Sequence, residues 1–395
     1  MTKPVGLESL IVKQEGFPFF SRELMRARQL ELLNFQLRRA KARSPFYRDY
    51  PDALPSLEEL KSLPFTTADD IRQSFSRLCL VPPDEFARLR TASTSGTSGA
   101  PKRIAYSQYD CMRTLDFFEC GLGELIFPGD RVLICMPFTD SLSLGGLIAR
   151  AVKRLGAVPV AAGAGKSFGQ YIDICTREST NVYIGPPVLL LSILRMSGGV
   201  LPLRRALVSG DHCTDSVRAA AEKALGSCLF PHYGLRESGL GCALTCSAHE
   251  GLHVRENDVI CEIISQDGAP LPPMQWGELV ITTIGMDAMP LFRYRTGDFA
   301  RVLSEVCPCG SEVLRIEVTE RIQRGIGIGF YDELLFAFDE VVDFSISGQN
   351  AVISVTEESA DLRGSVRRLL RGFSVSFRLA RLTDLPMYPG KRRIL

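Results

Sequence analysis

The sequence predicts an α/β protein with a large N-terminal domain of helix-covered, largely parallel sheets, a β-rich subdomain, and a small α+β domain at the C-terminus. The chain has 395 residues, enough for roughly two to three domains. In its middle, short apolar runs alternate with amphipathic stretches, which is typical of parallel strands joined by helices. From about residue 255 onward, short strands separated by turns replace that alternation and indicate the β-rich part.

The composition is that of an ordinary globular protein. Hydrophobic residues make up 45% and charged residues 23%, and 46 Lys and Arg against 45 Asp and Glu give a net charge of +1. Such a balance creates no large field directed at nucleic acid or an anionic membrane, so we expect neither as a partner. No apolar run is long enough to span a bilayer, and residues 1–16 lack the apolar core of a signal peptide. We therefore expect a cytoplasmic enzyme, with a homodimer left open.

The predicted elements follow one another in a clear order. A long helix should begin after Ser21, which can act as its N-cap, and end before Pro45. Four buried strands and three amphipathic helices should then build the parallel sheet, whose ligands would bind at the carboxyl ends of the strands. The strands lie at 131–138, 157–163, 181–187 and 204–210, and the helices at 143–156, 168–179 and 214–226.

The β-rich part and the C-terminal domain are predicted from their own patterns. The strands of the β-rich part are expected at 258–265, 277–283, 299–303 and 314–318. Three alternating glycines, Gly325, Gly327 and Gly329, are typical of a flexible connection. Beyond them we expect helices at 332–341 and 360–372 and strands at 343–348, 351–357 and 375–382.

The 12 cysteines are scattered, which makes a disulfide framework an unfavoured interpretation. Cys79, Cys135 and Cys261 lie in apolar surroundings and should behave as small buried hydrophobes. Only Cys307 and Cys309, in the segment VCPCG, are closely spaced.

Two polar segments have the composition of a nucleotide site. Residues 91–107, TASTSGTSGAPKRIAYS, combine glycines and hydroxyls that can surround phosphate oxygens, and they end near a lysine. Their spacing is not that of a Walker motif, so a flexible polar loop remains an alternative. Residues 232–239, HYGLRESG, carry an aromatic ring that can stack on a base and Glu237, which can hold a magnesium ion. The alternative there is a strand-to-turn connection with one acidic residue.

Two further segments complete the set. In FRYRTGD, at 292–298, Asp298 can accept hydrogen bonds from a ribose diol, or it can cap a turn. The C-terminal LPMYPGKRRIL contains a lysine that can enter a site formed elsewhere, or it is a basic tail.

The order and separation of these four segments resemble the adenylate-forming superfamily and, within it, the phenylacetate–CoA ligase family. TSGTSGAPK is similar to the phosphate loop of that family, HYGLRESG to its adenine-stacking motif, and GELVITTIGMDAMPLFRYRTGD to its ribose-binding segment. DLPMYPGKRRIL is similar to the terminal motif that carries a catalytic lysine, and SPFYRDY and LPFTTADDIR also match. The resemblance implies an N-terminal domain at 1–318 and a lid at 319–395.

The resemblance implies that the protein activates a carboxylic acid with ATP and Mg²⁺, releases pyrophosphate, and transfers the acyl group from the adenylate to coenzyme A. Lys391, Glu237 and Thr97 are the implied catalytic residues, with Lys391 bridging carboxylate and phosphate oxygens. The implied nucleotide-binding residues are Ser95, Gly96, Thr97, Ser98, Gly99, Lys102, Ser209, Gly210, Asp211, Tyr233, Gly234, Asp298 and Arg321. The implied substrate pocket, small and apolar enough for an aromatic or compact acid, includes Phe138, Gly185, Pro186, Gly210 and Leu235.

Some members of that family bind a structural zinc ion through a comparable set of cysteines and histidine. By this resemblance, Cys246, His253, Cys307 and Cys309 form a closed Cys₃His shell, with His249 as the alternative histidine. Four buried, reduced residues without a metal are the other interpretation.

The chain also departs from the family pattern. Glu320 stands where the family has a glycine, the usual hinge aspartates are missing, and Ala68 replaces a lysine. The changed hinge makes an amine, a carrier protein or a reductase an alternative acceptor to coenzyme A. A non-catalytic ligand-binding protein on the same fold is the alternative from another class.

Overall fold

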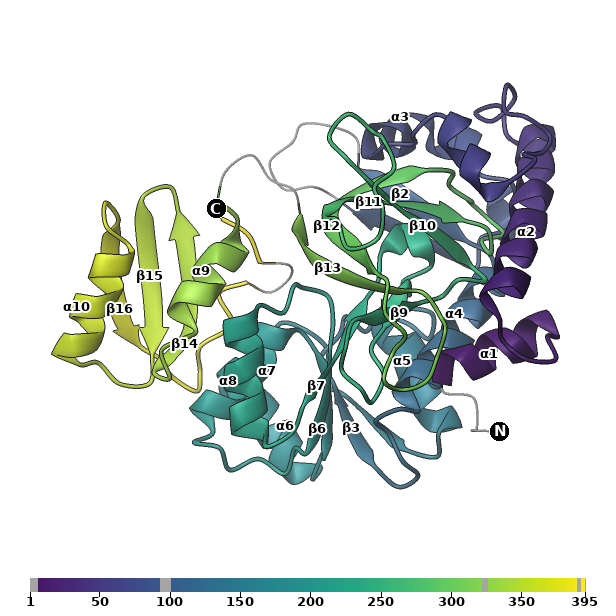
Figure 1. Cartoon of the computed structure of the whole chain (residues 1–395). Helices are drawn as coiled ribbons and strands as arrows, with labels where there is room; N and C mark the ends of the chain where they lie inside the picture. Colours follow the sequence, from purple (N-terminus) through teal and green to yellow (C-terminus); the bar gives the residue numbers. More distant parts are fainter. Residues whose placement is uncertain (1–5, 93–100, 322–325, 389–391, 395) are drawn as a thin grey trace. The chain divides into compact units, whose positions relative to one another are not determined.

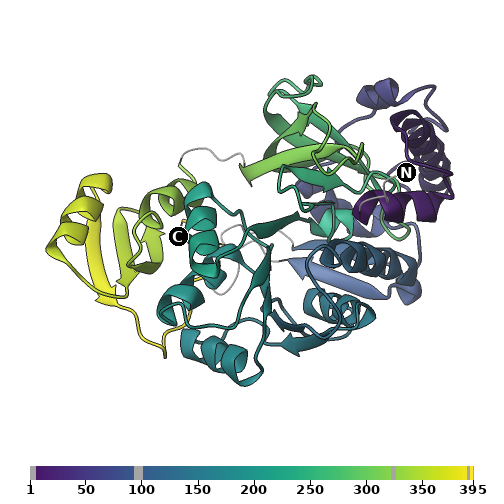
Figure 2. The ribbon, with the colours of Figure 1, turned by 60° about the horizontal axis from the view of Figure 1, so that its bottom comes forward.

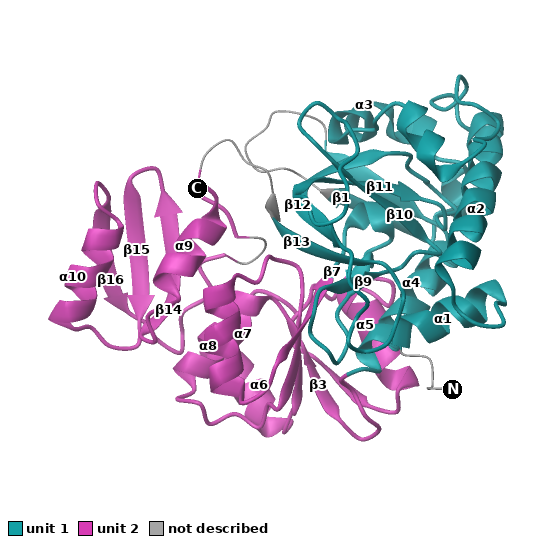
Figure 3. Ribbon diagram, viewed as in Figure 1, with its two compact units in different colours: residues 1–124, 233–322 teal, residues 125–232, 323–395 magenta. Residues whose placement is uncertain are grey.

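The computed structural model describes residues 6–92, 101–321, 326–388 and 392–394 (Figure 1). The chain forms two compact units, each built from two separate stretches of sequence (Figure 3). Unit 1 comprises residues 1–124 and 233–322, and unit 2 comprises residues 125–232 and 323–395. The predicted boundary at residue 318, between an N-terminal domain and a lid, stays a prediction.

Helices α2, α3 and α4 of unit 1 begin where the sequence supplies capping side chains. The Ser21 hydroxyl accepts a hydrogen bond from the Leu24 N–H and starts α2, which ends at Arg43, two residues before Pro45, so this predicted helix is confirmed. Thr67 and Asp70 form a reciprocal capping box at the start of α3. The helices are α1 (Gly6–Glu15), α2 (Arg22–Arg43), η1 (Leu57–Ser62), α3 (Ala68–Leu78), η2 (Pro83–Glu85), α4 (Gln108–Leu122) and η3 (Arg236–Ser238).

Unit 1 contains the predicted β-rich part. Its main sheet has the strand order β10-β11-β12-β13-β9-β8, and each neighbouring pair is antiparallel. A separate antiparallel pair joins β1 and β2. The strands are β1 (Arg88–Ala92), β2 (Lys102–Tyr106), β8 (Ala243–Leu244), β9 (Leu252–Val254), β10 (Val259–Ile264), β11 (Gly277–Thr283), β12 (Tyr294–Leu303) and β13 (Arg315–Arg321).

Unit 2 contains the predicted parallel sheet, with the strand order β4-β3-β5-β6-β7. Helices α6, α7 and α8 pack side by side on one face, and α5 lies against the other (Figures 1 and 2). The elements are β3 (Arg131–Ile134), α5 (Leu144–Arg154), β4 (Val158–Ala161), α6 (Phe168–Arg177), β5 (Val182–Gly185), α7 (Pro187–Met196), β6 (Arg205–Val208), α8 (Asp215–Leu225) and β7 (Leu229–Tyr233).

The C-terminal part of unit 2 is an α+β domain, as expected. Its sheet has the order β14-β15-β16, with an antiparallel first pair and a parallel second pair that α10 connects. The elements are α9 (Ile328–Leu335), β14 (Val341–Ser347), β15 (Asn350–Val355), α10 (Ala360–Leu369) and β16 (Ser374–Leu379).

The first helix of this domain is displaced from its predicted range. The helix predicted over 332–341 is confirmed only at 332–335: it begins at Ile328 and ends at Leu335, and residue 341 already starts a strand. Gly327 is the N-cap of this helix with a φ of −80°, and Gly329 lies buried inside it. The two described glycines therefore adopt backbone that any residue can adopt, and packing of the helix outweighs their low helix propensity.

The apolar core of unit 2 continues from the parallel sheet into the C-terminal domain. Ser192 of α7 donates a hydrogen bond to the Val342 carbonyl at 2.7 Å, and Arg195 donates to the Phe336 carbonyl at 3.0 Å. Helix α7 therefore packs against both the parallel sheet and the C-terminal domain, which explains why it is largely apolar and why its Ser192 and Arg195 are hydrogen-bonded. No helix among the residues that the structure describes is long and apolar enough to cross a membrane.

Candidate functional site

Three side chains from unit 1 meet in a buried polar cluster. Lys102 begins β2, Glu237 lies in η3, and Tyr294 begins β12. The Lys102 Nζ donates to the Glu237 Oε1 and, at 3.2 Å, to the Tyr294 hydroxyl. The Tyr294 hydroxyl in turn donates to the Glu237 Oε1 at 3.0 Å. The structure therefore joins Lys102 and Glu237, which the sequence named separately, and adds Tyr294.

Glu237 is ionised although its side chain is only 4% exposed. Burial by itself raises the pKa of its carboxyl group, but the charge of Lys102 and the hydrogen bonds from Lys102 and Tyr294 hold the pKa below its usual value. A buried carboxylate beside a lysine can bind a divalent cation while the lysine moves to an anionic ligand such as a phosphate.

A second pair in unit 1 joins two more predicted residues. Tyr233 ends β7, Asp298 lies in β12, and the Tyr233 hydroxyl donates to the Asp298 Oδ2 at 2.6 Å. Burial, together with the charge of Asp298, raises the pKa of Tyr233 well above its usual value, so the hydroxyl stays protonated. Arg321 lies opposite Asp298 in the register of β12 and β13, and Gly234 is exposed directly after Tyr233.

In unit 2, Ser209, Gly210 and Asp211 follow the carboxyl end of β6, as expected for a ligand-binding edge. Gly210 has a φ of +91°, a conformation that favours glycine. The Ser209 hydroxyl is 2.8 Å from the Nδ1 of His232. Burial lowers the pKa of His232 to about 4, so this ring is neutral at neutral pH.

The proposed pocket residues have different surroundings. A cavity of about 50 Å³ in unit 2 is lined by Pro186 and Asp211, together with Cys135, Ala164, Gly165, Tyr171, Val188, Leu189, Asp343, Pro386, Tyr388 and Arg392. Phe138 is 45% exposed. A Cβ at Gly185 would lie 2.3 Å from the Tyr183 hydroxyl, so packing requires a glycine there. Leu235, in unit 1, precedes η3 and is partly exposed.

Several predicted site residues lie outside the described part of the chain. These are Ser95, Gly96, Thr97, Ser98, Gly99 and Lys391, and the side chain of Arg321 is likewise not described.

Arg392, one residue after Lys391, is 7% exposed and lies among three carboxylates of unit 2. Its guanidinium donates to the Asp343 Oδ1 at 2.7 Å and to the Asp332 Oδ1 at 3.0 Å. Its backbone N–H donates to the Asp211 Oδ2 at 2.9 Å. Burial raises the pKa of Asp332 to about 6, although the charge of Arg392 opposes that rise.

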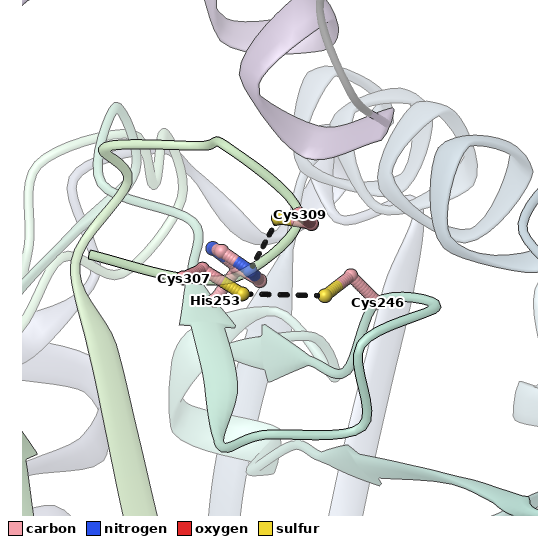
Figure 4. Close-up of side chains that lie close together, drawn as sticks. All are labelled: Cys246, His253, Cys307 and Cys309. Atoms are coloured by element: carbon pink, nitrogen blue, oxygen red, sulfur yellow. Dashed lines mark hydrogen bonds between the residues drawn. The ribbon is translucent and has the colours of Figure 1, made fainter. Parts of the chain in front are cut away.

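The predicted cysteine–histidine set forms one cluster in unit 1 (Figure 4). The ligand atoms of Cys246, His253, Cys307 and Cys309 all lie within 4.8 Å of one another. The Sγ atoms of Cys246 and Cys307 are 3.6 Å apart, as are the Cys309 Sγ and the His253 Nε2. His253 extends from β9, Cys246 follows β8, and the other two cysteines lie in the loop between β12 and β13.

Tyr294, His232 and Arg392 were not among the predicted site residues. Each lies inside a motif that the sequence had already indicated: FRYRTGD, HYGLRESG and YPGKRRIL. Their position inside these motifs was the only sequence feature that could have indicated a role in the site. The partners, such as Asp343 for Arg392, are too distant in sequence for any local pattern to indicate.

The arrangement of parallel and antiparallel sheets has counterparts among solved structures. A 2-hydroxyisobutyryl-CoA ligase in its postadenylation state matches with a TM-score of 0.77 and 18% identity, over 93% of this chain and 88% of that one. The same enzyme in its thioesterification state matches with a TM-score of 0.72 and 17% identity, over 95% and 90% of the two chains. These likenesses establish the fold.

Sequence similarity defines the class of protein. Residues 89–287 match the family of AMP-binding enzymes. The phenylacetate-coenzyme A ligase of Pseudomonas putida is 31% identical over 302 residues, which cover 71% of this chain and 67% of that protein. That of Thermus thermophilus is 31% identical over 314 residues, covering 75% and 69%. The chain therefore belongs to the AMP-binding enzymes and, within them, to the phenylacetate-coenzyme A ligase family, which confirms the resemblance.

Proposed function

We propose that the protein joins a carboxylic acid to coenzyme A in two steps, of which the first consumes ATP. A carboxylate oxygen attacks the α-phosphorus of ATP, the bond to pyrophosphate breaks, and an acyl adenylate forms. The thiol of coenzyme A then attacks the acyl carbon, loses its proton, and AMP leaves. The observation that carries the proposal is the buried Lys102–Glu237–Tyr294 cluster, in a chain of a family whose relatives are named as such ligases.

The residues of unit 1 divide the work of holding ATP. Lys102, with Ser95, Gly96, Thr97, Ser98 and Gly99, would bind the β- and γ-phosphates, and Glu237 with Thr97 would hold the magnesium ion that ATP carries. The fit of Glu237 to a cation is supported by its burial and its ionised state. Tyr233, followed by Gly234, would stack on adenine while its hydroxyl orients Asp298 toward the ribose, where Arg321 would assist.

The remaining roles fall to residues of unit 2. Ser209, Gly210 and Asp211 would line the other edge of adenine, and Lys391 would bridge carboxylate and phosphate oxygens as charge develops between them. Bound magnesium neutralises phosphate charge, while these side chains orient the reactants and exclude water.

The acid is proposed to be aromatic or compact. The relatives from Pseudomonas putida and Thermus thermophilus are phenylacetate-coenzyme A ligases. The proposed pocket residues Phe138, Gly185, Pro186 and Leu235 are small or apolar, and a flat acyl group suits such surroundings. A cytoplasmic location, where ATP and coenzyme A are available, is part of the same proposal.

Cys246, His253, Cys307 and Cys309 are proposed to hold a structural zinc ion. Bond lengths near 2.3 Å to sulfur and 2.0–2.1 Å to nitrogen put the donors of a tetrahedral site about 3.5–3.8 Å apart. The two contacts of 3.6 Å in the cluster agree with that spacing. Four protein ligands close the shell, so the ion would stabilise the loop between β12 and β13 and take no part in the reaction.

ATP–pyrophosphate exchange with a panel of acids tests the adenylation step. We would offer phenylacetate, benzoate, 2-hydroxyisobutyrate and a medium-chain fatty acid, with acetate as the smallest member. Exchange should be fastest with an aromatic or compact acid. The same acid with coenzyme A should then give a thioester, identified by mass. No exchange above background with any acid would refute the proposed activity.

A further inference from the structure

We infer that Tyr294 is a positioning residue for magnesium-dependent ATP binding and that it acts through Glu237. The inference rests on the proposed function, to which it adds a residue with no assigned role. Tyr294 contacts both charged residues of the cluster, accepting from the Lys102 Nζ at 3.2 Å and donating to the Glu237 Oε1 at 3.0 Å. The Lys102 Nζ also lies 5.7 Å from the centre of the Tyr294 ring.

The two donors meet the same carboxylate oxygen. Lys102 and Tyr294 both bond to the Oε1 of Glu237, and among the residues that the structure describes no other side chain bonds to this carboxylate. The carboxylate also accepts a hydrogen bond from its own backbone N–H, so the direction in which Glu237 presents its second oxygen depends on these two side chains and on that N–H. One of them, Lys102, carries the charge that phosphates attract.

Tyr294 is the more firmly held of the two partners. It is 2% exposed, and its backbone pairs with Ile281 of β11 on one side and with Thr66 on the other. A lysine side chain has four rotatable bonds and loses much conformational entropy when it is held in one geometry. ATP can therefore draw Lys102 toward its phosphates while Tyr294 remains where it is.

Glu237 keeps its hydrogen bond from Tyr294 when Lys102 turns to the phosphates of ATP. When Lys102 turns to the phosphates, Glu237 loses its cationic partner, and an unpaired buried carboxylate is costly. The Tyr294 hydroxyl still donates to its Oε1, so the carboxylate stays oriented for a magnesium ion. Loss of the hydroxyl should weaken the gain in ATP affinity that magnesium provides, more than it weakens the binding of metal-free ATP.

Titration calorimetry of the full-length protein measures this gain without any acid substrate. ATP is titrated into wild type and Tyr294→Phe, once with excess Mg²⁺ and once with EDTA. The Kd with EDTA divided by the Kd with Mg²⁺ is the magnesium gain, and it is compared between the two proteins. We expect the magnesium gain to fall about tenfold in Tyr294→Phe, the scale of one hydrogen bond to a charged group. An unchanged gain would overturn the inference.

Tyr47→Phe is the matched control. Tyr47 is a fully buried tyrosine of the same unit, and its hydroxyl donates to the Pro290 carbonyl at 2.9 Å. It contacts none of Lys102, Glu237 and Tyr294 through a hydrogen bond, so the magnesium gain should stay at the wild-type value. An equal fall in both variants would mean that any buried hydroxyl has this effect and would contradict a positioning role.

Two further arms separate the possible failures. In a Glu237→Gln background, Tyr294→Phe should cause no additional loss of the magnesium gain, and a full additional loss would contradict action through Glu237. If Tyr294→Phe does not fold, 3-fluorotyrosine at position 294 keeps the shape and strengthens the donor, so the gain should rise, and a constant gain refutes the inference. Normal magnesium-dependent ATP binding without pyrophosphate exchange would refute the proposed activity alone.

Discussion

Lys391 is the residue on which the proposed adenylation chemistry depends most, although it lies outside the described residues. Replacement by alanine removes the positive charge that would stabilise the transition state, an effect of roughly 3–4 kcal/mol or a 10²–10³-fold loss of rate. We therefore expect Lys391→Ala to lower ATP–pyrophosphate exchange by that factor.

Arg393→Ala is the control for this change, because Arg393 is an exposed arginine two residues further along. It should leave the exchange rate within about twofold of wild type. Unchanged exchange in Lys391→Ala, with the best acid of the panel, would show that the catalytic assignment is wrong.

His232 links the stability of unit 2 to pH. Its pKa is about 4, against 6.5 for an ordinary histidine, because burial disfavours the charged ring. Between these values the unfolded chain binds a proton that the folded chain does not, so this contribution is complete above pH 6.5 and is lost as the pH falls toward 4. At about 1.4 kcal/mol per pKa unit, the free energy of unfolding should fall about 2–3 kcal/mol more in wild type than in His232→Gln between pH 7.5 and 4.5.

Urea unfolding at the two pH values measures that difference. Ser209→Ala removes the hydrogen bond to His232 and leaves the buried ring, so its pH dependence should match that of wild type. Equal pH dependence in wild type and His232→Gln would mean that burial of the ring does not depress its pKa.

At the scale of elements, the loop between β12 and β13 depends on the cysteine–histidine cluster. Cys309→Ser should reduce bound zinc from one ion per chain and lower the unfolding temperature by on the order of 10 °C, because the free energy of metal binding is coupled to folding. Metal analysis and thermal unfolding of freshly purified protein measure both effects.

Cys228→Ser is the matched control, since Cys228 is exposed and lies in the other unit. It should change neither the zinc content nor the unfolding temperature. A wild-type zinc content far below one ion per chain, in protein purified without any chelator, would contradict the zinc site.

Two helices, α7 and α9, differ from what the local sequence patterns predict. Helix α7 has no predicted counterpart, because its two leading prolines and the apolar residues after them resemble the end of a buried strand. A proline is well tolerated in the first turn of a helix, and α7 is largely apolar because it packs against both β5 and β14. Helix α9 was expected later in the chain for a related reason, since glycines suggested a connection where packing forms a helix.

At the scale of the whole molecule, the two reaction steps can be separated by coenzyme A. The usual hinge aspartates are missing here, so the thioester step is the part of the activity that the sequence puts most in question. We expect coenzyme A to accelerate AMP release at least tenfold with the best acid. The thiol displaces AMP from the adenylate, whereas without coenzyme A the adenylate stays bound and AMP is released slowly. Rapid-quench measurement of AMP with and without coenzyme A gives this ratio.

The matched measurement is pyrophosphate exchange in the same samples, which should not require coenzyme A. If coenzyme A does not change the rate of AMP release with any active acid, the proposed thioester step is refuted and the proposed adenylation step still stands. In that case an amine, a carrier protein or a reductase becomes the acceptor to test.

For the cysteine–histidine set the sequence left His249 open as the alternative to His253. By itself it determined the α/β class, the family and the four motifs. Each of these features depends on residues that are close together in the sequence. Strands and helices differ in the period of their apolar residues, and Lys102, Glu237 and Asp298 lie in short segments of characteristic composition. The N-cap Ser21 is local in the same sense, because a helix start depends on a few neighbouring residues.

Tertiary structure alone decided which of these residues meet. Tyr294 bonds to Glu237 across 57 positions of sequence, and Arg392 bonds to Asp343 across 49, with no local signal for either pair. Tertiary packing also decided that Gly329 is helical and that an apolar segment after two prolines is α7. The reason is physical: contacts and burial between distant segments outweigh local propensities of less than about 1 kcal/mol per residue.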